Sequence, residues 1–190
     1  MPKVQITKEQ VLEAALKVII RDGHEQMNIK TVAAELGRST QTISWTFGSM
    51  GSFRNEIAAY TLSYANRKMH SDSDNPLEEY GRVGTAYIDL AFDEPNIIQF
   101  LRSDERRLQA EGGFGQSFDK ATMHERALAF AKIYDCTPEK AESFMLDMLI
   151  YTQGLVSMIL AGGIGIDKAT AYKMLGNISN TCLSSIKGKH

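Results

Sequence analysis

The chain has 190 residues, of which 43% are hydrophobic and 23% charged, and its formal net charge is -2. This composition excludes disordered and fibrous proteins and is ordinary for a soluble protein with one core, or with a small domain and a larger one. Its two cysteines, Cys136 and Cys182, lie far apart without a CxxC motif, so neither a disulfide framework nor a zinc site is expected. The N-terminus lacks the apolar segment of an export signal, and we expect a cytoplasmic protein.

Charge is distributed unevenly along the chain. Residues 1–70 carry nine Lys or Arg against six Asp or Glu, whereas residues 71–190 carry twelve against seventeen. A mildly basic N-terminal part is compatible with nucleic-acid binding through that part alone. The longest apolar run, residues 144–160, is interrupted by Asp147 and by several small polar residues, so it predicts a buried helix and no membrane partner.

The apolar period predicts an all-α protein, because nearly every segment repeats near 3.6 residues and none alternates as a strand does. A capping box of Thr7 and Gln10 begins the first helix, and Gly23 ends it. Asn28 caps a second, short helix that Gly37 ends. These signals predict two helices joined by a short connection.

Two further serines mark the next helix starts. Ser39 is expected to cap a third helix of about two turns. Ser49 is expected to cap a longer fourth helix with an apolar and aromatic face formed by Phe53, Ile57, Tyr60 and Tyr64. The polar stretch at residues 70–76 then marks a boundary. We therefore expect a small N-terminal domain at 1–50, a connecting helix at about 50–69 and a larger helical bundle domain at 70–190.

The larger domain also carries helix signals. Helices are expected from about residue 77 to residue 92, from Pro95, after Thr137 and after Asp167. Glycine-rich stretches at 111–115 and 162–165 are expected to separate them.

The second and third helices have the spacing of a helix-turn-helix. A small residue at Ala33 lets the two helices cross closely, Gly37 can adopt positive φ in the turn, and Ile43 anchors the underside of the third helix. This arrangement turns the polar side of the third helix outward, toward a DNA major groove and its backbone. The outward side chains are Thr40, Gln41, Thr42, Ser44 and Trp45.

The N-terminal part resembles the TetR family of bacterial transcriptional regulators over roughly residues 7–65. The resemblance rests on "DG" at 22–23, "IKTVAAELGRS" at 29–39, "WTF" at 45–47 and the serine that opens the fourth helix. It implies a homodimer whose two recognition helices enter successive major grooves of a near-palindromic operator. It also implies that the larger helical domain binds a small molecule and dimerises.

The resemblance assigns roles to residues of the helix-turn-helix. Thr40, Gln41 and Thr42 occupy its base-reading positions, and the Gln41 amide suits a bidentate contact to adenine. The positions that touch the DNA backbone are occupied by Lys30, Thr31, Ser39 and Trp45. Two departures remove typical phosphate contacts, because Ser44 stands where the family most often has tyrosine and Met50 where it usually has lysine. Their loss is expected to weaken DNA binding.

A plainer interpretation of the same residues stays open. The polar side of the third helix could be an ordinary solvated surface, with Lys30 and Arg54 as surface charges. Trp45 argues against this, since an exposed tryptophan on a polar helix is unusual unless it packs on Phe53 or meets a partner.

The larger domain contains enough flexible and aromatic side chains to line an apolar pocket. The candidates for ligand binding are Tyr87, Phe92, Phe100, Met123, Phe130, Tyr134, Met148 and Tyr151, most of which are expected to be plain core. Asp147 is either a counter-ion for a cationic ligand or, as we favour, part of a polar stripe with Ser143 and Glu139.

The last two helices are apolar around more of their circumference than one core requires, which predicts a four-helix seam with a second copy. The candidates for that dimer interface are Leu155, Ile159, Leu175, Ile178 and Cys182.

Together these features predict a ligand-responsive transcriptional regulator, with repression as the expected mode, that needs no cofactor or metal. An alternative is a helical dimeric small-molecule sensor or protein-interaction module with weakened DNA binding. An enzyme is not expected, because the sequence has no HExxH motif and no phosphate-binding glycine loop, and its four histidines are dispersed.

Overall fold

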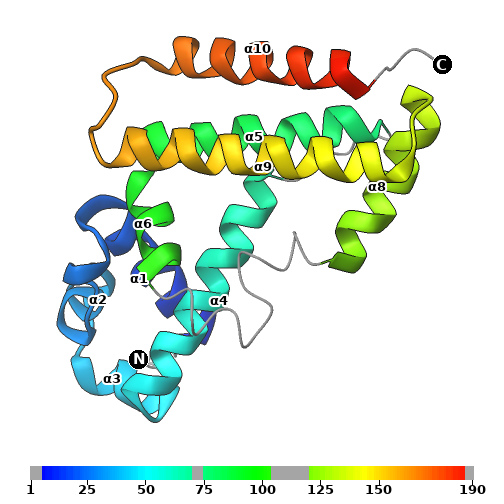
Figure 1. Ribbon diagram of the computed structural model, residues 1–190. Coiled ribbons are helices and arrows are strands. Elements are labelled where there is room, and N and C mark those ends of the chain that lie inside the picture. The colour runs from blue at the N-terminus through cyan, green and yellow to red at the C-terminus, as the bar shows by residue number, and fades with distance from the viewer. Residues whose placement is uncertain (1–5, 70–74, 104–119, 187–190) are drawn as a thin grey trace. The chain divides into compact units, whose positions relative to one another are not determined.

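The computed structural model describes residues 6–69, 75–103 and 120–186. Within these ranges all regular secondary structure is helical, so the all-α prediction is confirmed (Figure 1). The glycine-rich connection expected at 111–115 and most of the polar boundary at 70–76 lie outside the described residues.

Contacts divide the chain into two compact units. The first takes the described residues of Met1–Asn66 and Glu94–Phe114, and the second takes those of Arg67–Asp93 and Gly115–His190. In the described part the chain therefore passes between the units at 66–67, within a helix, and at 93–94. The sequence-based boundary at residue 70 assigns residues 94–103 to the larger domain, whereas their contacts group them with the N-terminal helices.

The first unit is built around its N-terminal helix. In chain order its elements are α1 (Lys8–Asp22), the 3-10 helix η1 (His24–Gln26), α2 (Ile29–Leu36), α3 (Thr40–Phe47), most of α4 (Met50–Met69) and α6 (Pro95–Ser103). α1 packs against α2, α3 and α6. The predicted inward positions of α2 are buried at Val32 and Ala33, and Leu36 is half-buried.

The ends of α1 follow the sequence signals. The Thr7 hydroxyl accepts a hydrogen bond from the Gln10 amide at 3.2 Å, and the Gln10 side chain accepts one from the Thr7 amide at 3.0 Å. This is the predicted capping box, and Gly23 ends the helix as expected. On α4, the predicted face is buried at Phe53 and Ile57, where the helix meets the core of the unit.

α6 joins the first unit through both apolar and polar contacts. Its buried side chains are Ile97, Ile98, Phe100 and Leu101. Asn96 donates a hydrogen bond from Nδ2 to the carbonyl oxygen of Ile20, in the last turn of α1, at 3.0 Å. The Tyr64 hydroxyl of α4 donates to the carboxylate of Glu94, directly before α6, at 2.9 Å. These contacts explain why α6 groups with α1 although the chain reaches it through the second unit.

The second unit is a bundle whose described helices are α5 (Pro76–Asp93), α8 (Lys120–Tyr134), α9 (Pro138–Leu160) and α10 (Lys168–Ile186). α9 lies at its centre and packs against α5, α8 and α10. Figure 1 shows α9 and α10 side by side and antiparallel. Thr137 caps α9 through the Lys140 amide, and Asp167 caps α10 through the Thr170 amide at 2.8 Å, as the sequence predicts.

α9 is the one helix in the described ranges that is long and apolar enough to cross a membrane by length and composition. A core helix of a soluble protein passes the same test. Phe144, Met145 and Val156 of α9 are almost fully buried, as expected for a helix at the centre of a bundle.

Candidate nucleic-acid interface

The turn between α2 and α3 has the geometry that the sequence predicts. Asn28 caps α2 by accepting hydrogen bonds from the amides of Lys30 at 2.9 Å and Thr31 at 3.2 Å. Gly37 ends α2 in the left-handed conformation, with φ 61° and ψ 39°, a region that residues with a Cβ rarely adopt. The Arg38 amide then donates to the Ala33 carbonyl at 2.9 Å, and α3 begins two residues later.

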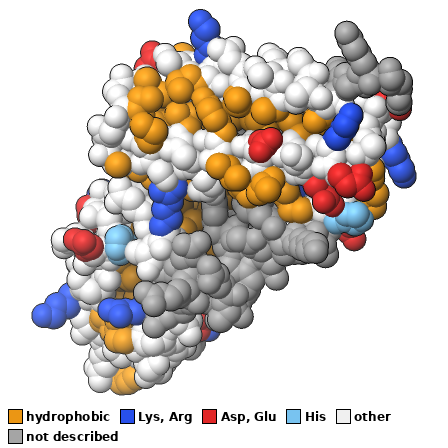
Figure 2. Space-filling model, viewed as in Figure 1, with side chains coloured by type: hydrophobic (Ala, Val, Ile, Leu, Met, Phe, Trp, Pro, Cys, Tyr) orange, Lys and Arg blue, Asp and Glu red, His pale blue; other side chains and the backbone are white. Residues whose placement is uncertain are grey.

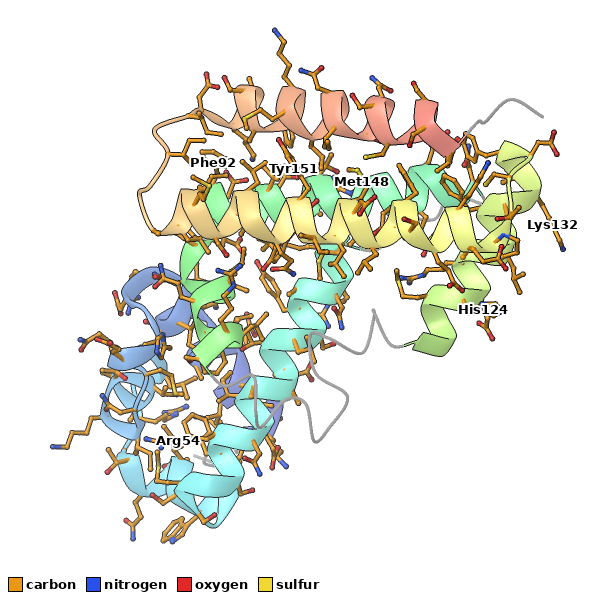
Figure 3. All side chains as sticks on the ribbon, in the orientation of Figure 1. Arg54, Phe92, His124, Lys132, Met148 and Tyr151 are labelled. Atoms are coloured by element: carbon orange, nitrogen blue, oxygen red, sulfur yellow. The ribbon has the colours of Figure 1, made fainter. Side chains whose placement is uncertain are left out.

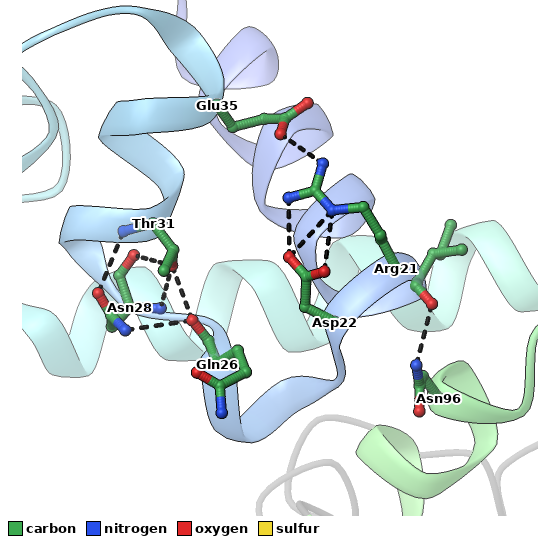
Figure 4. A network of polar contacts seen from close by, with 8 residues as sticks. Arg21, Asp22, Gln26, Asn28, Thr31, Glu35 and Asn96 are labelled. Atoms are coloured by element: carbon green, nitrogen blue, oxygen red, sulfur yellow. Dashed lines mark hydrogen bonds and ion pairs between the residues drawn. The ribbon is translucent and has the colours of Figure 1, made fainter.

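An ion pair between Arg21 and Glu35 joins α1 to α2 (Figure 4). The Arg21 guanidinium donates to Asp22 and, at 2.8 Å, to Glu35 near the end of α2. These hydrogen bonds raise the pKa of Arg21 and lower the pKa of Asp22 below its usual range. Because the pair with Glu35 spans the two helices, it helps to hold α2 against α1.

α3 has a buried side and an exposed side. Ile43 is 1% and Phe47 7% exposed, and the Phe47 ring lies 4.9 Å from that of Phe53 in α4. On the other side, the predicted contact residues Thr40, Gln41, Ser44 and Trp45 are exposed, and Thr42 is half-buried. Sequence reasoning therefore placed the buried face of this helix correctly.

Trp45 is the most exposed large hydrophobic side chain of the described residues, at 76%. The sequence analysis expected Trp45 either to pack on Phe53 or to meet a partner. In the structure the Phe53 ring is buried against Phe47, and Trp45 stays exposed to solvent. Such exposure leaves a large apolar surface in water next to a row of polar side chains. The exposed side of α3 therefore combines a large apolar surface with polar side chains.

The polar side chains of α3 differ in how they are engaged. Ser44 donates to the Thr40 carbonyl at 3.2 Å, whereas the Gln41 amide has no hydrogen-bond partner among the described residues. Ser39 stands at the N-cap, but its hydroxyl contacts the Thr42 hydroxyl at 3.1 Å and does not cap the helix. The predicted Ser39 cap is therefore wrong in detail, and the first amides of α3 lack a side-chain cap, which suits contact with an anion.

α3 itself carries no cation, but exposed cations occur on the segments that precede and follow it. Lys30 at the start of α2, Arg38 in the turn and Arg54 in the first turns of α4 are exposed (Figure 3 labels Arg54). Lys8 is engaged elsewhere, with Nζ 2.5 Å from Glu56 and 5.5 Å from the centre of the Phe47 ring. In the sequence analysis Arg54 entered only as a surface charge of the plainer interpretation. It is exposed and lies in the same unit as α3, so it is a further candidate for phosphate contact.

The candidates for ligand binding do not all lie in one unit. Phe100 is buried in the first unit, 6.1 Å from the His24 ring, whereas the other candidates belong to the second. Phe130 stacks on Tyr134 at 4.4 Å and on Phe144 at 5.0 Å, and it is fully buried. Buried Met148 and half-buried Phe92 and Tyr151 are labelled in Figure 3, and Met123 is also half-buried.

Two further side chains in the second unit bear on the ligand question. Tyr87 is buried and donates to Gln153 at 3.0 Å. Asp147 is exposed, which agrees with its place on a solvated stripe. Of the eight candidates, Tyr87, Phe100, Phe130 and Met148 are thus buried and the other four are half-buried.

The candidates for a dimer interface also differ in how exposed they are. Leu155 and Leu175 are 5% and 7% exposed, so other side chains of the same chain already cover them. Ile159, Ile178 and Cys182 are half-buried. The apolar side chains of α9 that remain exposed are Leu146, Ile150 and Met158, at 51%, 62% and 49%. Sequence reasoning missed these three, although their spacing of four and eight residues marks one side of the helix.

Several solved structures have a similar fold and match nearly the whole chain. A TetR-like transcriptional regulator from Rhodococcus sp. RHA1 matches with a TM-score of 0.58 and 16% identity, covering 95% of this chain and 96% of that one. The chain has the fold of the TetR-family transcriptional regulators.

Other structures with the TetR fold agree. Another transcriptional regulator from Rhodococcus sp. Rha1 matches with a TM-score of 0.59 and 12% identity, covering 96% of this chain and 98% of that one. A TetR variant from Acinetobacter baumannii AYE, in complex with minocycline, matches with a TM-score of 0.53 and 15% identity, covering 96% and 94%. No protein-family model and no curated protein matches the sequence. At these identities the likeness establishes the TetR fold, with its helix-turn-helix and helical second domain.

Proposed function

We propose that this chain is a cytoplasmic, ligand-responsive transcriptional regulator, a repressor, that binds a near-palindromic operator as a homodimer and is not an enzyme. The observation that carries the proposal is the exposed side of α3, where Gln41 and Trp45 face solvent beside uncapped helix amides. A solvated helix needs no exposed tryptophan, whereas a DNA-reading helix uses such a surface.

Base readout is assigned to Thr40, Gln41 and Thr42. The Gln41 amide is exposed and has no partner among the described residues, so it can present both a donor and an acceptor to one adenine. Trp45, one turn further along α3, covers the sugar-phosphate backbone or an adjacent thymine methyl group. Lys30, Thr31, Ser39, Ser44 and Arg54 complete the contact surface.

A second copy of the chain is the proposed occupant of the apolar side of α9. Leu146, Ile150 and Met158 are each about half exposed, and Figure 2 shows hydrophobic side chains gathered along α9 and α10. A symmetric pairing of these helices would cover them in a four-helix arrangement. Ile159, Ile178 and Cys182 lie at the edge of that seam, and dimerisation doubles the few phosphate contacts that one α3 can make.

A small-molecule effector is proposed for the second unit. The TetR structure in complex with minocycline supports this for the fold, and the chain covers nearly all of that structure. Effector binding alters DNA affinity only if the effector binds the two arrangements of the units with different affinity.

Fluorescence of Trp45, the only tryptophan, tests the DNA-binding proposal. Duplex DNA from upstream of the chain's own gene is titrated into the protein at low and at moderate salt. We expect the emission to change with a saturating curve whose midpoint rises with salt. An unchanged emission at low salt, with the dimer confirmed by sedimentation, would favour the alternative of a dimeric sensor without strong DNA binding.

A further inference from the structure

The α3 helix is held in the first unit by few side chains. Its side-chain hydrogen bonds among the described residues all stay within residues 39–46, so none of them ties α3 to a neighbouring helix. The side chains that α3 buries are Ile43 and Phe47. The orientation of α3 therefore depends on how firmly these two side chains are held.

Phe47, the last residue of α3, contacts groups from two other helices. Its ring centre lies 4.9 Å from that of Phe53 in α4, with 59° between the ring planes. The ammonium of Lys8, the first residue of α1, stands over the Phe47 ring at 5.5 Å from its centre. A cation within about 6 Å of the centre of an aromatic ring is attracted to the negative face of the ring. Lys8 and Phe53 thus both hold Phe47.

Lys8 is itself held by α4. Its Nζ lies 2.5 Å from Glu56 Oε2, and the Ser52 hydroxyl donates to Oε1 of the same carboxylate at 3.3 Å. The Glu56 side chain is 29% exposed and that of Lys8 51%, so water and salt screen this pair only in part. One ammonium therefore joins the start of α1, the end of α3 and the second turn of α4.

We propose that Lys8 is a positioning residue for DNA reading: its ammonium, fixed by Glu56, holds the Phe47 ring and with it the orientation of α3. This inference rests on the proposed function. Gln41 lies in the first turn of α3 and Phe47 at its end, so a tilt of the helix about the Phe47 end displaces the Gln41 amide from its base. Lys8 acts through Phe47 and not on DNA, because Glu56 already engages its charge.

Base reading is more sensitive to such a tilt than phosphate contact. A bidentate contact to a base edge needs correct geometry, whereas lysine binds phosphate as a point charge on a flexible stem. Loss of the Lys8 charge should therefore reduce discrimination between DNA sequences and leave affinity for arbitrary DNA unchanged. A lysine that binds phosphate directly behaves in the opposite way, since its loss weakens binding to all sequences and reduces the salt slope by about 0.9 per contact.

Trp45 provides a readout that needs no DNA. It is the only tryptophan of the chain and lies on α3, two residues before Phe47. Time-resolved fluorescence anisotropy of the whole protein follows the nanosecond motion of this side chain and of the helix that carries it. Rotation of the indole about its own bonds is common to all variants, so a difference between them reports on α3.

Lys8→Met keeps an unbranched apolar side chain and removes the charge. We expect it to lose a larger share of the Trp45 anisotropy to internal motion than the wild type does. Lys8→Arg keeps a cation for both Glu56 and the Phe47 ring and should stay near the wild type. If Lys8→Met folds and its decay equals that of the wild type, the proposal is overturned.

Two other variants complete this test. Lys17→Met is the matched control, because Lys17 is also on α1, its side chain is 58% exposed, and its ion pair with Glu13 at 3.2 Å stays within one helix. It removes the same charge and should leave the decay unchanged. Glu56→Gln frees Lys8 from α4 and should also increase the loss of anisotropy. Where Lys8→Met does not fold, an unchanged decay in Glu56→Gln overturns the proposal.

DNA binding tests the consequence for reading. The ratio of affinities for an operator chosen by selection and for an unrelated duplex of equal length should fall about fivefold or more in Lys8→Met, the lower end of what one bidentate base contact contributes. The salt slope should match that of the wild type. An unchanged ratio with a slope shallower by about 0.9 or more would make Lys8 a phosphate contact and overturn its positioning role. If the protein binds no DNA at all, the Trp45 anisotropy still decides whether Lys8 holds α3, and the failure belongs to the proposed function alone.

Discussion

Replacing Met50 by lysine should strengthen DNA binding and steepen its dependence on salt. By the sequence resemblance described above, Met50 stands at the position where a lysine is expected to contact phosphate. It opens α4 directly after the Ser49 cap and is 37% exposed. Its side chain is thus accessible without disturbing the buried Phe53 one turn later. A cation in the first turn opposes the helix dipole, at a cost of about 0.3–1 kcal/mol that reduces stability and not DNA contact.

The size of the effect follows from counterion release. Each added phosphate contact steepens the dependence of log affinity on log salt by about 0.9, so a dimer gains about 1.8. Raising the salt from about 50 to about 200 mM should then weaken the variant about tenfold more than the wild type. Fluorescence anisotropy of labelled operator DNA at four salt concentrations measures both slopes.

Leu128→Lys is the matched control, because Leu128 is 40% exposed but lies on α8 in the second unit. It adds the same charge and should leave the slope within error of the wild type. If Met50→Lys and Leu128→Lys gave the same slope, the start of α4 would not contact phosphate, and the assignment of the DNA-binding surface around it would be wrong.

Three further substitutions test other parts of the account. Gln41→Ala should weaken binding by about 1–3 kcal/mol to an operator that has adenine at the base pair contacted by Gln41, and it should relax the base preference there. Competition with single-base operator variants measures both effects. Gly37→Ala should destabilise the chain by about 1–2 kcal/mol in thermal unfolding, because φ is 61° and an added Cβ meets nothing within 4 Å, so that backbone strain is the main cost. Ile150→Asp, at a side chain 62% exposed on α9, should shift the dimer toward monomer in sedimentation, whereas Ile133→Asp, 52% exposed on α8, should not; a stable Ile150→Asp dimer would place the seam elsewhere.

Local signals predicted the helix ends well because each acts within a few residues. Thr7, Asn28 and Asp167 accept hydrogen bonds from amides two or three residues away, and Gly37 adopts a backbone conformation set by its own lack of Cβ. Ser39 shows the limit of such signals. It stands at the N-cap, yet its hydroxyl contacts Thr42, and composition alone does not distinguish the two hydrogen bonds.

Features that depend on packing between distant segments were predicted less well. Apolar periodicity does not tell which side of α9 faces its own bundle, so it could not show that Leu155, a candidate for the dimer seam, is only 5% exposed within one chain. The grouping of α6 with α1 depends on Asn96 reaching the Ile20 carbonyl, 76 residues away in sequence.

Selection of duplexes from a random-sequence DNA library by the full-length protein tests the central claim most directly. Two α3 helices in a symmetric dimer should enrich an inverted repeat whose half-site centres lie about 10 base pairs apart, and Gln41→Ala should lose a preferred adenine in each half. Recovery of no enriched sequence at low salt, from protein shown to be folded and dimeric, would contradict the assignment of α3 as a DNA-reading helix.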